Sequence, residues 1–123
     1  MKKTLLLLIL ALPIVFTSCK KEKDTTYSVT FNMPFEVSIT AFIFEYNKAG
    51  EIVKNNTVDV PSKGVITKDY TANKNSEKLK VQITMSSGGY SLTEWVQQVF
   101  YLKIGKENFI TLDGNTLIGP SEP

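Results

Sequence analysis

The sequence predicts an all-β protein, a single antiparallel β-sandwich of about seven short strands that follows an amino-terminal segment removed on export. Three observations predict this fold. Several short segments alternate between apolar and polar residues, which is the period of a strand with one buried face. Residues that favour turns separate these segments. No convincing long helix competes with the strands, and strands of this number in about 95 residues are typical of a sandwich.

The first two strands are expected between Tyr27 and Tyr46. Apolar and polar residues alternate from Tyr27 to Met33, and Pro34 prevents the continuation of a central strand. From Phe35 to Tyr46 the apolar residues occupy one phase before Ala41 and the other phase after it. This change of phase predicts a bulge near Ala41 or a stretch that is buried on both faces.

Two further strands are expected before residue 72. A turn at 47–50 precedes a β-rich run from Ile52 to Val60, which returns as a hairpin and is interrupted at Asn55 and Asn56. A second turn at 61–64 leads into a short, weak strand from Val65 to Thr71.

The second half begins with the clearest strand pattern, from Leu79 to Met85. Residues Trp95 to Leu102 are rich in aromatic and β-branched residues, which favours a strand. Ser91 and Glu94 also fit a helix capping box, so a helix remains the alternative for this segment. Short strands are then expected at 109–112 and 116–118, joined by a hairpin turn at 113–115.

The first 18 residues have the layout of an export signal. Lys2 and Lys3 form a basic start, an apolar stretch runs from Leu5 to Phe16, and small or polar residues follow. The apolar stretch is too short to span a bilayer, which takes about 20 residues.

The segment Phe16-Thr17-Ser18-Cys19 resembles the lipobox of bacterial lipoproteins. In that family, small residues precede a cysteine that is linked to diacylglycerol and becomes the mature amino terminus. Phe16 stands where the family usually has leucine, although it keeps an apolar side chain there. The resemblance implies lipid attachment at Cys19, and two or three acyl chains anchor a protein stably to a membrane.

Residues 19–26 read as a lipidated cysteine followed by a polar tether, because no apolar residue follows Cys19 before Tyr27. This lysine-rich, Asn- and Thr-rich chain is similar to the small lipoproteins of gut Bacteroidota, which implies a lipid anchor in the outer membrane. Its periplasmic and outer faces remain open alternatives. In the same phylum, Asp24-Thr25-Thr26 resembles an O-glycosylation site, with the glycan on Thr25.

Residues 27–123 are expected to form the sandwich domain. Two of its segments, Phe44–Asn47 and Trp95–Leu102, resemble corresponding segments of such Bacteroidota lipoproteins, and the resemblance implies an immunoglobulin-like or transthyretin-like sandwich. These segments are structural in character, so the resemblance implies a location and a fold without an activity.

Composition excludes several classes of function. Lys2 and Lys3 account for the formal charge of +2, so the mature chain has equal numbers of lysines and acids. It contains no arginine and no basic patch in the folded part, which argues against nucleic-acid binding. One cysteine and no histidine leave no set of those ligands for a metal and no histidine for acid–base catalysis. We therefore expect no metal and no cofactor.

Candidates for catalysis are weak. Glu45 and Glu51 flank the first hairpin turn, and two carboxyl groups suffice for glycoside hydrolysis, but a solvated pair at the mouth of a loop is the better interpretation. Residues 113–116 place oxygen ligands at alternate positions, as calcium loops do, but lack the remaining ligands. We expect no catalytic residues and no enzymatic activity.

The aromatic residues are the more informative set. If 95–102 is a strand, Trp95 and Tyr101 lie on one of its faces, and Tyr90 is close by on the preceding loop. These three residues are the expected ligand or partner face, although Trp95 also fits a place between the sheets. The main hypothesis is a non-catalytic envelope module that binds a protein or has a structural role. Carbohydrate binding by exposed aromatics is the alternative.

Overall fold

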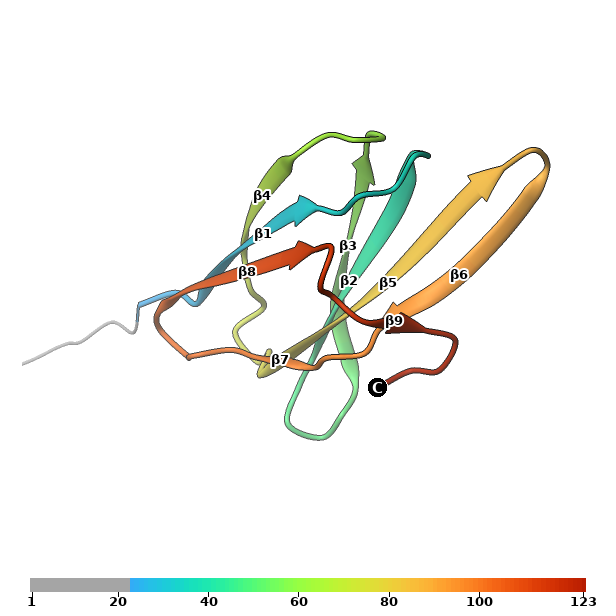
Figure 1. Ribbon diagram of the computed structural model, residues 1–123. Helices are drawn as coiled ribbons and strands as arrows, with labels where there is room; N and C mark the ends of the chain where they lie inside the picture. The colour runs from blue at the N-terminus through green and yellow to red at the C-terminus, as the bar shows by residue number, and fades with distance from the viewer. Residues whose placement is uncertain (1–22) are drawn as a thin grey trace, which may run out of the picture.

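The computed structural model describes residues 23–123, and all of their regular secondary structure is β-strand. Two sheets pack face to face (Figure 1). The prediction of a β-sandwich is confirmed, with nine strands in place of about seven. The strands are β1 Thr26–Asn32, β2 Ile39–Tyr46, β3 Ile52–Val60, β4 Ile66–Thr71, β5 Lys78–Ser87, β6 Tyr90–Val96, β7 Phe100–Tyr101, β8 Glu107–Asp113 and β9 Ile118–Gly119.

One sheet has three strands in the order β4-β1-β8, and the other has the order β3-β2-β5-β6-β9 with β7 added to β5. Every strand pairing is antiparallel except that of β1 with β8, which is parallel from Thr26↔Glu107 to Asn32↔Asp113. Because β8 and β9 belong to different sheets, the turn at 113–115 is a crossover between them. The expected hairpin at this turn is therefore wrong.

The core lies between the sheets and is built from alternate residues of each strand. The predicted alternation in β1 and β5 is confirmed, with Tyr27, Val29 and Phe31 buried in β1 and Leu79 and Val81 in β5. Full burial of one large apolar side chain stabilises the fold by about 1.5 to 3 kcal/mol. The remaining core side chains come mainly from β2, β3 and β8.

The second strand differs from its prediction. It begins at Ile39, and its pairing is regular through Ala41, so neither a bulge nor burial on both faces occurs there. Residues Ile39 and Ala41 face the core, while Phe42 and Phe44 face outward and are half-buried. The sequence shows two apolar phases because the outer face of this strand is aromatic.

The third strand runs without a break through Asn55 and Asn56, so the expected interruption is wrong. Asn55 and Asn56 pair with Phe44 and Ile43 of β2, and the Nδ2 of Asn56 donates a hydrogen bond to the phenol oxygen of Tyr27 at 2.8 Å.

Segment 95–102 is extended, but it does not form one strand. The sixth strand ends at Val96, residues 97–99 leave the sheet, and β7 adds only Phe100 and Tyr101. The backbone N–H of Gln97 bonds instead to the carbonyl of Leu117 at 2.8 Å. Residues 91–94 belong to β6, so the helical alternative is wrong.

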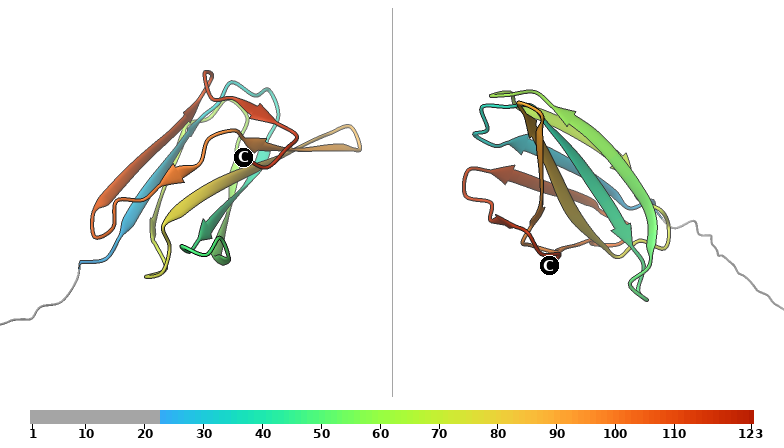
Figure 2. Two further views of the ribbon diagram at one scale, coloured as in Figure 1. Left: turned by 90° about the horizontal axis from the view of Figure 1, so that it is seen from below. Right: turned by 90° about the vertical axis from the view of Figure 1, so that its right-hand side faces the viewer.

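The hairpin of β5 and β6 projects beyond the rest of the sandwich. Figures 1 and 2 show it leaving the body at the end opposite to the start of β1. The last pair that β5 makes with β2 is Met85↔Ile39, so Ser86 and Ser87 continue past β2. The chain turns back at Gly88 and Gly89, and both have positive φ values, of 58° and 85°. Such values are typical of a two-residue type I′ hairpin turn.

Candidate interaction surface

The three aromatic residues that the sequence singles out do not form one surface. Tyr101 pairs with Lys78, Trp95 with Gln82, and Tyr90 with Ser87 along β5. Directly paired residues point to the same face of a sheet, and a strand rises about 3.4 Å per residue. Tyr101 and Trp95 therefore share the outer face about 14 Å apart. Tyr90 lies about 17 Å beyond Trp95, on the opposite face, in β6 and not on the preceding loop.

Trp95 belongs to neither of the two environments considered for it. It lies on the outer side of the larger sheet, half-buried, and its ring centroid is 5.7 Å from that of Phe44. The ring of Phe44 in turn lies 6.4 Å from that of Phe42, nearly parallel to it. We call Phe42, Phe44, Tyr46 and Trp95 the outer aromatic face. Sequence reasoning missed Phe42 and Phe44 because the second apolar phase of this strand was interpreted as a bulge or as a stretch buried on both faces.

Charged groups border the outer aromatic face. The Nζ of Lys80 lies 4.8 Å from the ring centroid of Tyr46 and 2.7 Å from a carboxylate oxygen of Glu122. The side chain of Gln97 donates to the carbonyl of Ser121 at 2.7 Å. The carboxyl-terminal tail is thus held along one side of the aromatic rings. Burial raises the pKa of Tyr46, and the carboxylate of Glu122 raises it further.

The β5–β6 hairpin has a different chemistry. From Thr84 to Thr93 it has no charged residue, and its exposed apolar side chains are Tyr90 and Leu92, with 83% and 54% of their surface accessible. On the side of β6 that faces away from β5, β9 pairs only with the last two residues of the strand, Trp95 and Val96. Within residues 23–123, the part of β6 from Tyr90 to Glu94 therefore has no strand beside it on that side.

The phase of the hairpin shows which backbone groups are free along this edge. In a two-residue hairpin the residues next to the turn, here Ser87 and Tyr90, form a hydrogen-bonded pair, and such pairs alternate with non-bonded ones. The N–H and C=O groups of Ser91 and Thr93 therefore point away from β5. Trp95 has the same phase, and it is Trp95 that pairs with Gly119 of β9 on this side.

Glu45 is the main polar group that sequence reasoning placed wrongly. It is fully buried, not solvated, and it does not face Glu51, which is exposed and bonded to Asn47. One oxygen of Glu45 accepts the phenol proton of Tyr27 at 2.7 Å, and the other accepts the hydroxyl of Ser76 at 2.6 Å and the N–H of Asn73 at 2.8 Å. The sequence did contain a signal for this burial, because Glu45 continues the alternate positions of Ile39 and Ala41, which face the core.

This buried cluster joins both sheets, since Tyr27 comes from β1 and Glu45 from β2. Burial raises the pKa of the Tyr27 phenol far above its ordinary value, and the hydrogen bond to Glu45 raises it further. All donors to Glu45 come from within the fold, so the cluster fastens the two sheets and the loop at 73–76.

Residues 23–123 contain no group of three or more His, Cys, Asp or Glu side chains that could hold a metal ion. Their surface has several hollows that are partly open to solvent. At residues 113–116, which have a few of the oxygen ligands of a calcium loop, Asp113 bonds within its own turn to Asn115 and Thr116. No helix in this part of the chain is long and apolar enough to cross a membrane.

Two predicted modification sites lie at the amino-terminal side. Cys19 is outside the described residues, as are the signal segment and the first half of the expected tether, up to residue 22. Thr25 is 9% exposed, and its hydroxyl oxygen accepts the N–H of Gly105 at 2.8 Å. A glycan on Thr25 would have to be added before folding or would have to open this segment. Glycosylation of Thr25 stays a prediction.

Comparison with solved structures finds proteins with a similar fold. The T6SS lipoprotein TssJ1 from Pseudomonas aeruginosa is similar with a TM-score of 0.58 and 9% sequence identity, over 81% of this chain and 97% of that chain. The C-terminal domain of the T6SS protein TssM from EAEC is similar with a TM-score of 0.50 and 12% identity, over 79% of this chain and 99% of that chain. No protein-family model and no curated protein matches the sequence. At these identities the likeness concerns the fold alone: the chain has a β-sandwich of a kind that a bacterial lipoprotein also uses.

Proposed function

We propose that this chain is a lipid-anchored, non-catalytic protein of the bacterial outer membrane that binds another envelope protein. In this proposal residues 1–18 are removed, Cys19 bears the lipid, residues 20–26 lead into the domain, and residues 27–123 form the binding module. The lipobox-like segment and the likeness to a lipoprotein fold support the location. The open edge of β6 is the observation that supports binding.

An open edge of this kind suits the addition of a strand from a partner. Free backbone N–H and C=O groups at Ser91 and Thr93 offer two donors and two acceptors to an extended peptide. Exposed edges are usually protected by lysine, proline or a bulge. Residues Tyr90 to Thr93 have none of these, and the side chains of Tyr90 and Leu92 are available for contacts that give specificity.

The test replaces Thr93 by proline. Because the N–H of Thr93 points away from β5, proline removes a donor from the open edge without removing a bond between β5 and β6. Thr93→Ala is the matched control, since both variants lose the hydroxyl that lies 3.1 Å from that of Thr84. Thr93→Lys, which adds a protective charge to the edge, is a second variant with an unchanged backbone.

The assay is photo-crosslinking in intact cells from a probe at Leu92, with identification of the crosslinked protein. We expect one envelope protein to be captured by the unchanged edge and by Thr93→Ala. Capture should fall at least about tenfold with Thr93→Pro and Thr93→Lys, as expected for a loss of about 1.4 kcal/mol or more. Equal capture by all four proteins would show that the β6 edge is not the binding site.

Carbohydrate binding remains the second candidate, and the outer aromatic face is the observation that favours it. Trp95 and Phe44 offer neighbouring rings on which a sugar can stack. Trp95→Ala should abolish binding on a glycan array, while Thr93→Pro should leave it unchanged. An array without signal for the unmodified protein rejects this candidate.

Lipid attachment has its own test. The unmodified protein should incorporate labelled palmitate and partition with membranes, and Cys19→Ser should do neither. Palmitate in neither protein, with equal partition of both, contradicts the proposed anchor.

A further inference from the structure

The connection between β7 and β8 ends in a tight turn with an exposed apolar tip. The N–H of Lys106 bonds to the carbonyl of Lys103 at 3.2 Å, and Gly105 has a φ of +72°. Ile104 occupies the tip with 58% of its surface exposed. Turn tips usually hold glycine, proline or small polar residues. An isoleucine flanked by lysines is therefore unusual there, and we call Lys103–Lys106 the anchor-proximal turn.

This turn is fastened to the start of the described chain. The N–H of Gly105 donates to the hydroxyl oxygen of Thr25 at 2.8 Å, and the N–H of Thr26 donates to the carbonyl of Lys106 at 3.1 Å. The side chain of Asn108 reaches both partners: its Nδ2 donates to the carbonyls of Thr26, Lys103 and Lys106 at 3.1 to 3.2 Å. The position of the turn relative to the first residues of the sandwich is therefore fixed.

The length of chain before this point limits the distance to the proposed anchor. Cys19 precedes Lys23 by four residues, so their Cα atoms are at most about 14 Å apart. The carbonyl oxygen of Lys23 lies 3.5 Å from the place that a Cβ on Gly105 would occupy. A lipid on Cys19 thus keeps the anchor-proximal turn close to the membrane surface.

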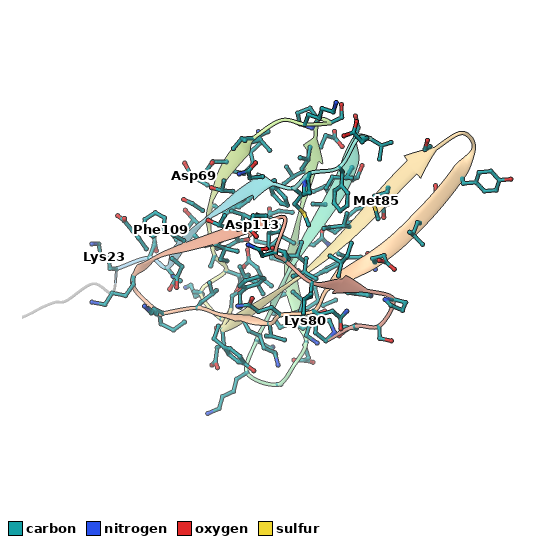
Figure 3. The ribbon with its side chains drawn as sticks, in the orientation of Figure 1. Lys23, Asp69, Lys80, Met85, Phe109 and Asp113 are labelled. Atoms are coloured by element: carbon teal, nitrogen blue, oxygen red, sulfur yellow. The ribbon has the colours of Figure 1, made fainter. Side chains whose placement is uncertain are left out.

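The surroundings of Ile104 suit a phospholipid surface. Lys103 and Lys106 lie on either side of it in the sequence, and Lys23 and Lys74 line a surface hollow together with it. The nearby acids are Asp24, Glu77 and Glu107. Figure 3 shows Lys23 and the exposed Phe109 at this same end of the molecule. Lysines near a bilayer are attracted to anionic headgroups, and apolar side chains enter the boundary below them.

We propose that the anchor-proximal turn docks on the phospholipid bilayer and inserts Ile104 at the level of the headgroups, so that the lipid and the turn together set the orientation of the sandwich. This inference rests on the proposed lipidation of Cys19. It places the β5–β6 hairpin, at the opposite end, away from the membrane (Figure 1).

The experiment uses the full lipidated protein, purified from membranes and reconstituted into vesicles of phosphatidylethanolamine and phosphatidylglycerol. An environment-sensitive fluorophore is attached to Ile104→Cys or, as a control at the far end, to Tyr90→Cys. Cys19 is the only natural cysteine, and a lipidated Cys19 has no free thiol, so each variant has one labelling site. Lipids with a quencher near the headgroup report contact with the bilayer.

We expect a blue-shifted emission at position 104 and quenching at least about twofold stronger than at position 90, as for a group in the headgroup boundary. A second pair has the label at Lys106→Cys with either Ile104 or Ile104→Asp. The aspartate should reduce quenching to the level at position 90. Two results overturn the proposed docking without affecting the lipidation of Cys19. One is an emission at position 104 that is typical of a fluorophore in water. The other is a blue-shifted emission at position 104 that the lipid-borne quencher does not reduce. Labelling of Cys19 in the unmodified protein shows instead that the anchor itself is absent.

Discussion

Replacing Tyr27 by phenylalanine should lower the stability of the fold more than any other single removal of a hydroxyl from a tyrosine. The phenol donates to Glu45 at 2.7 Å and accepts from the side chain of Asn56 at 2.8 Å. The ring itself remains in Tyr27→Phe, so the packing at 5.2 Å against Tyr70 is kept. The change therefore isolates the two hydrogen bonds of one oxygen atom.

The expected magnitude follows from these two partners. A hydrogen bond to an ionised group contributes about 1.5 to 3 kcal/mol, and one between neutral groups contributes about 1 kcal/mol. Glu45 stays fully buried in the variant and keeps its bonds to Ser76 and Asn73, which reduces the loss. We expect the free energy of unfolding to fall by about 2 to 3 kcal/mol, and the melting temperature to fall by roughly 10 °C.

Urea denaturation followed by the fluorescence of Trp95, the only tryptophan, measures this change. Tyr90→Phe is the matched control because its phenol lies on an 83% exposed side chain, and it should change stability by less than about 0.5 kcal/mol. A loss below about 0.5 kcal/mol in Tyr27→Phe, with an unchanged slope against urea, would refute the view that Glu45 is held across the sheets by this phenol.

Three further results are expected. The pKa of Tyr27 is raised in the folded protein, so the unfolded chain loses the phenol proton near pH 10 while the folded protein keeps it. The free energy of unfolding should therefore fall above pH 10, by up to about 1.4 kcal/mol per pH unit more than in Tyr27→Phe. Urea denaturation at several alkaline pH values measures this, and the same pH dependence in both proteins would contradict it. An alanine at position 89 would have to adopt the φ of +85° that Gly89 has, so Gly89→Ala should lower the free energy of unfolding by about 1 to 2 kcal/mol. Ser87→Ala is the control and should change this free energy little. Equal effects of the two substitutions in thermal unfolding would exclude backbone strain as the cause. Asn108→Ala removes the hydrogen bonds that this side chain makes with the backbones of Thr26, Lys103 and Lys106, and it should lower the free energy of unfolding by about 2 kcal/mol. Hydrogen exchange at the amide of Gly105 should become faster. An exchange rate at Gly105 equal to that of the unmodified protein would contradict the role of Asn108 in holding the turn.

The strand pattern was predictable wherever one face of a strand is apolar and the other polar. Both β1 and β5 meet this condition, and their buried residues follow from period two alone. Prediction failed in β2, because Phe42 and Phe44 face outward and Glu45 faces inward, which reverses the usual link between polarity and burial. The order of the strands in the sheets was not predictable either, because the periodicity of a strand shows which side chains share a face but not which strand lies beside it.

The candidate surface was predictable only in part, for a similar reason. Trp95 was correctly placed in a strand, but its contact with Phe44 depends on the alignment of β6 and β2 on either side of β5. The break after Val96 separates Tyr101 from that strand, and no local signal in 97–99 marks it clearly. The open edge of β6 follows from the shortness of β9, which is a property of the whole sheet.

The parallel pairing of β1 with β8 has a consequence for the order of events when the protein is made. The central strand of the smaller sheet lies at the beginning of the domain, and one of its two neighbours comes from about eighty residues later. A chain that emerges amino terminus first cannot complete this sheet until nearly all of it has emerged. Contacts so distant in sequence close slowly. A protein exported through a narrow channel would therefore stay incompletely folded during passage and acquire its finished form only on the far side.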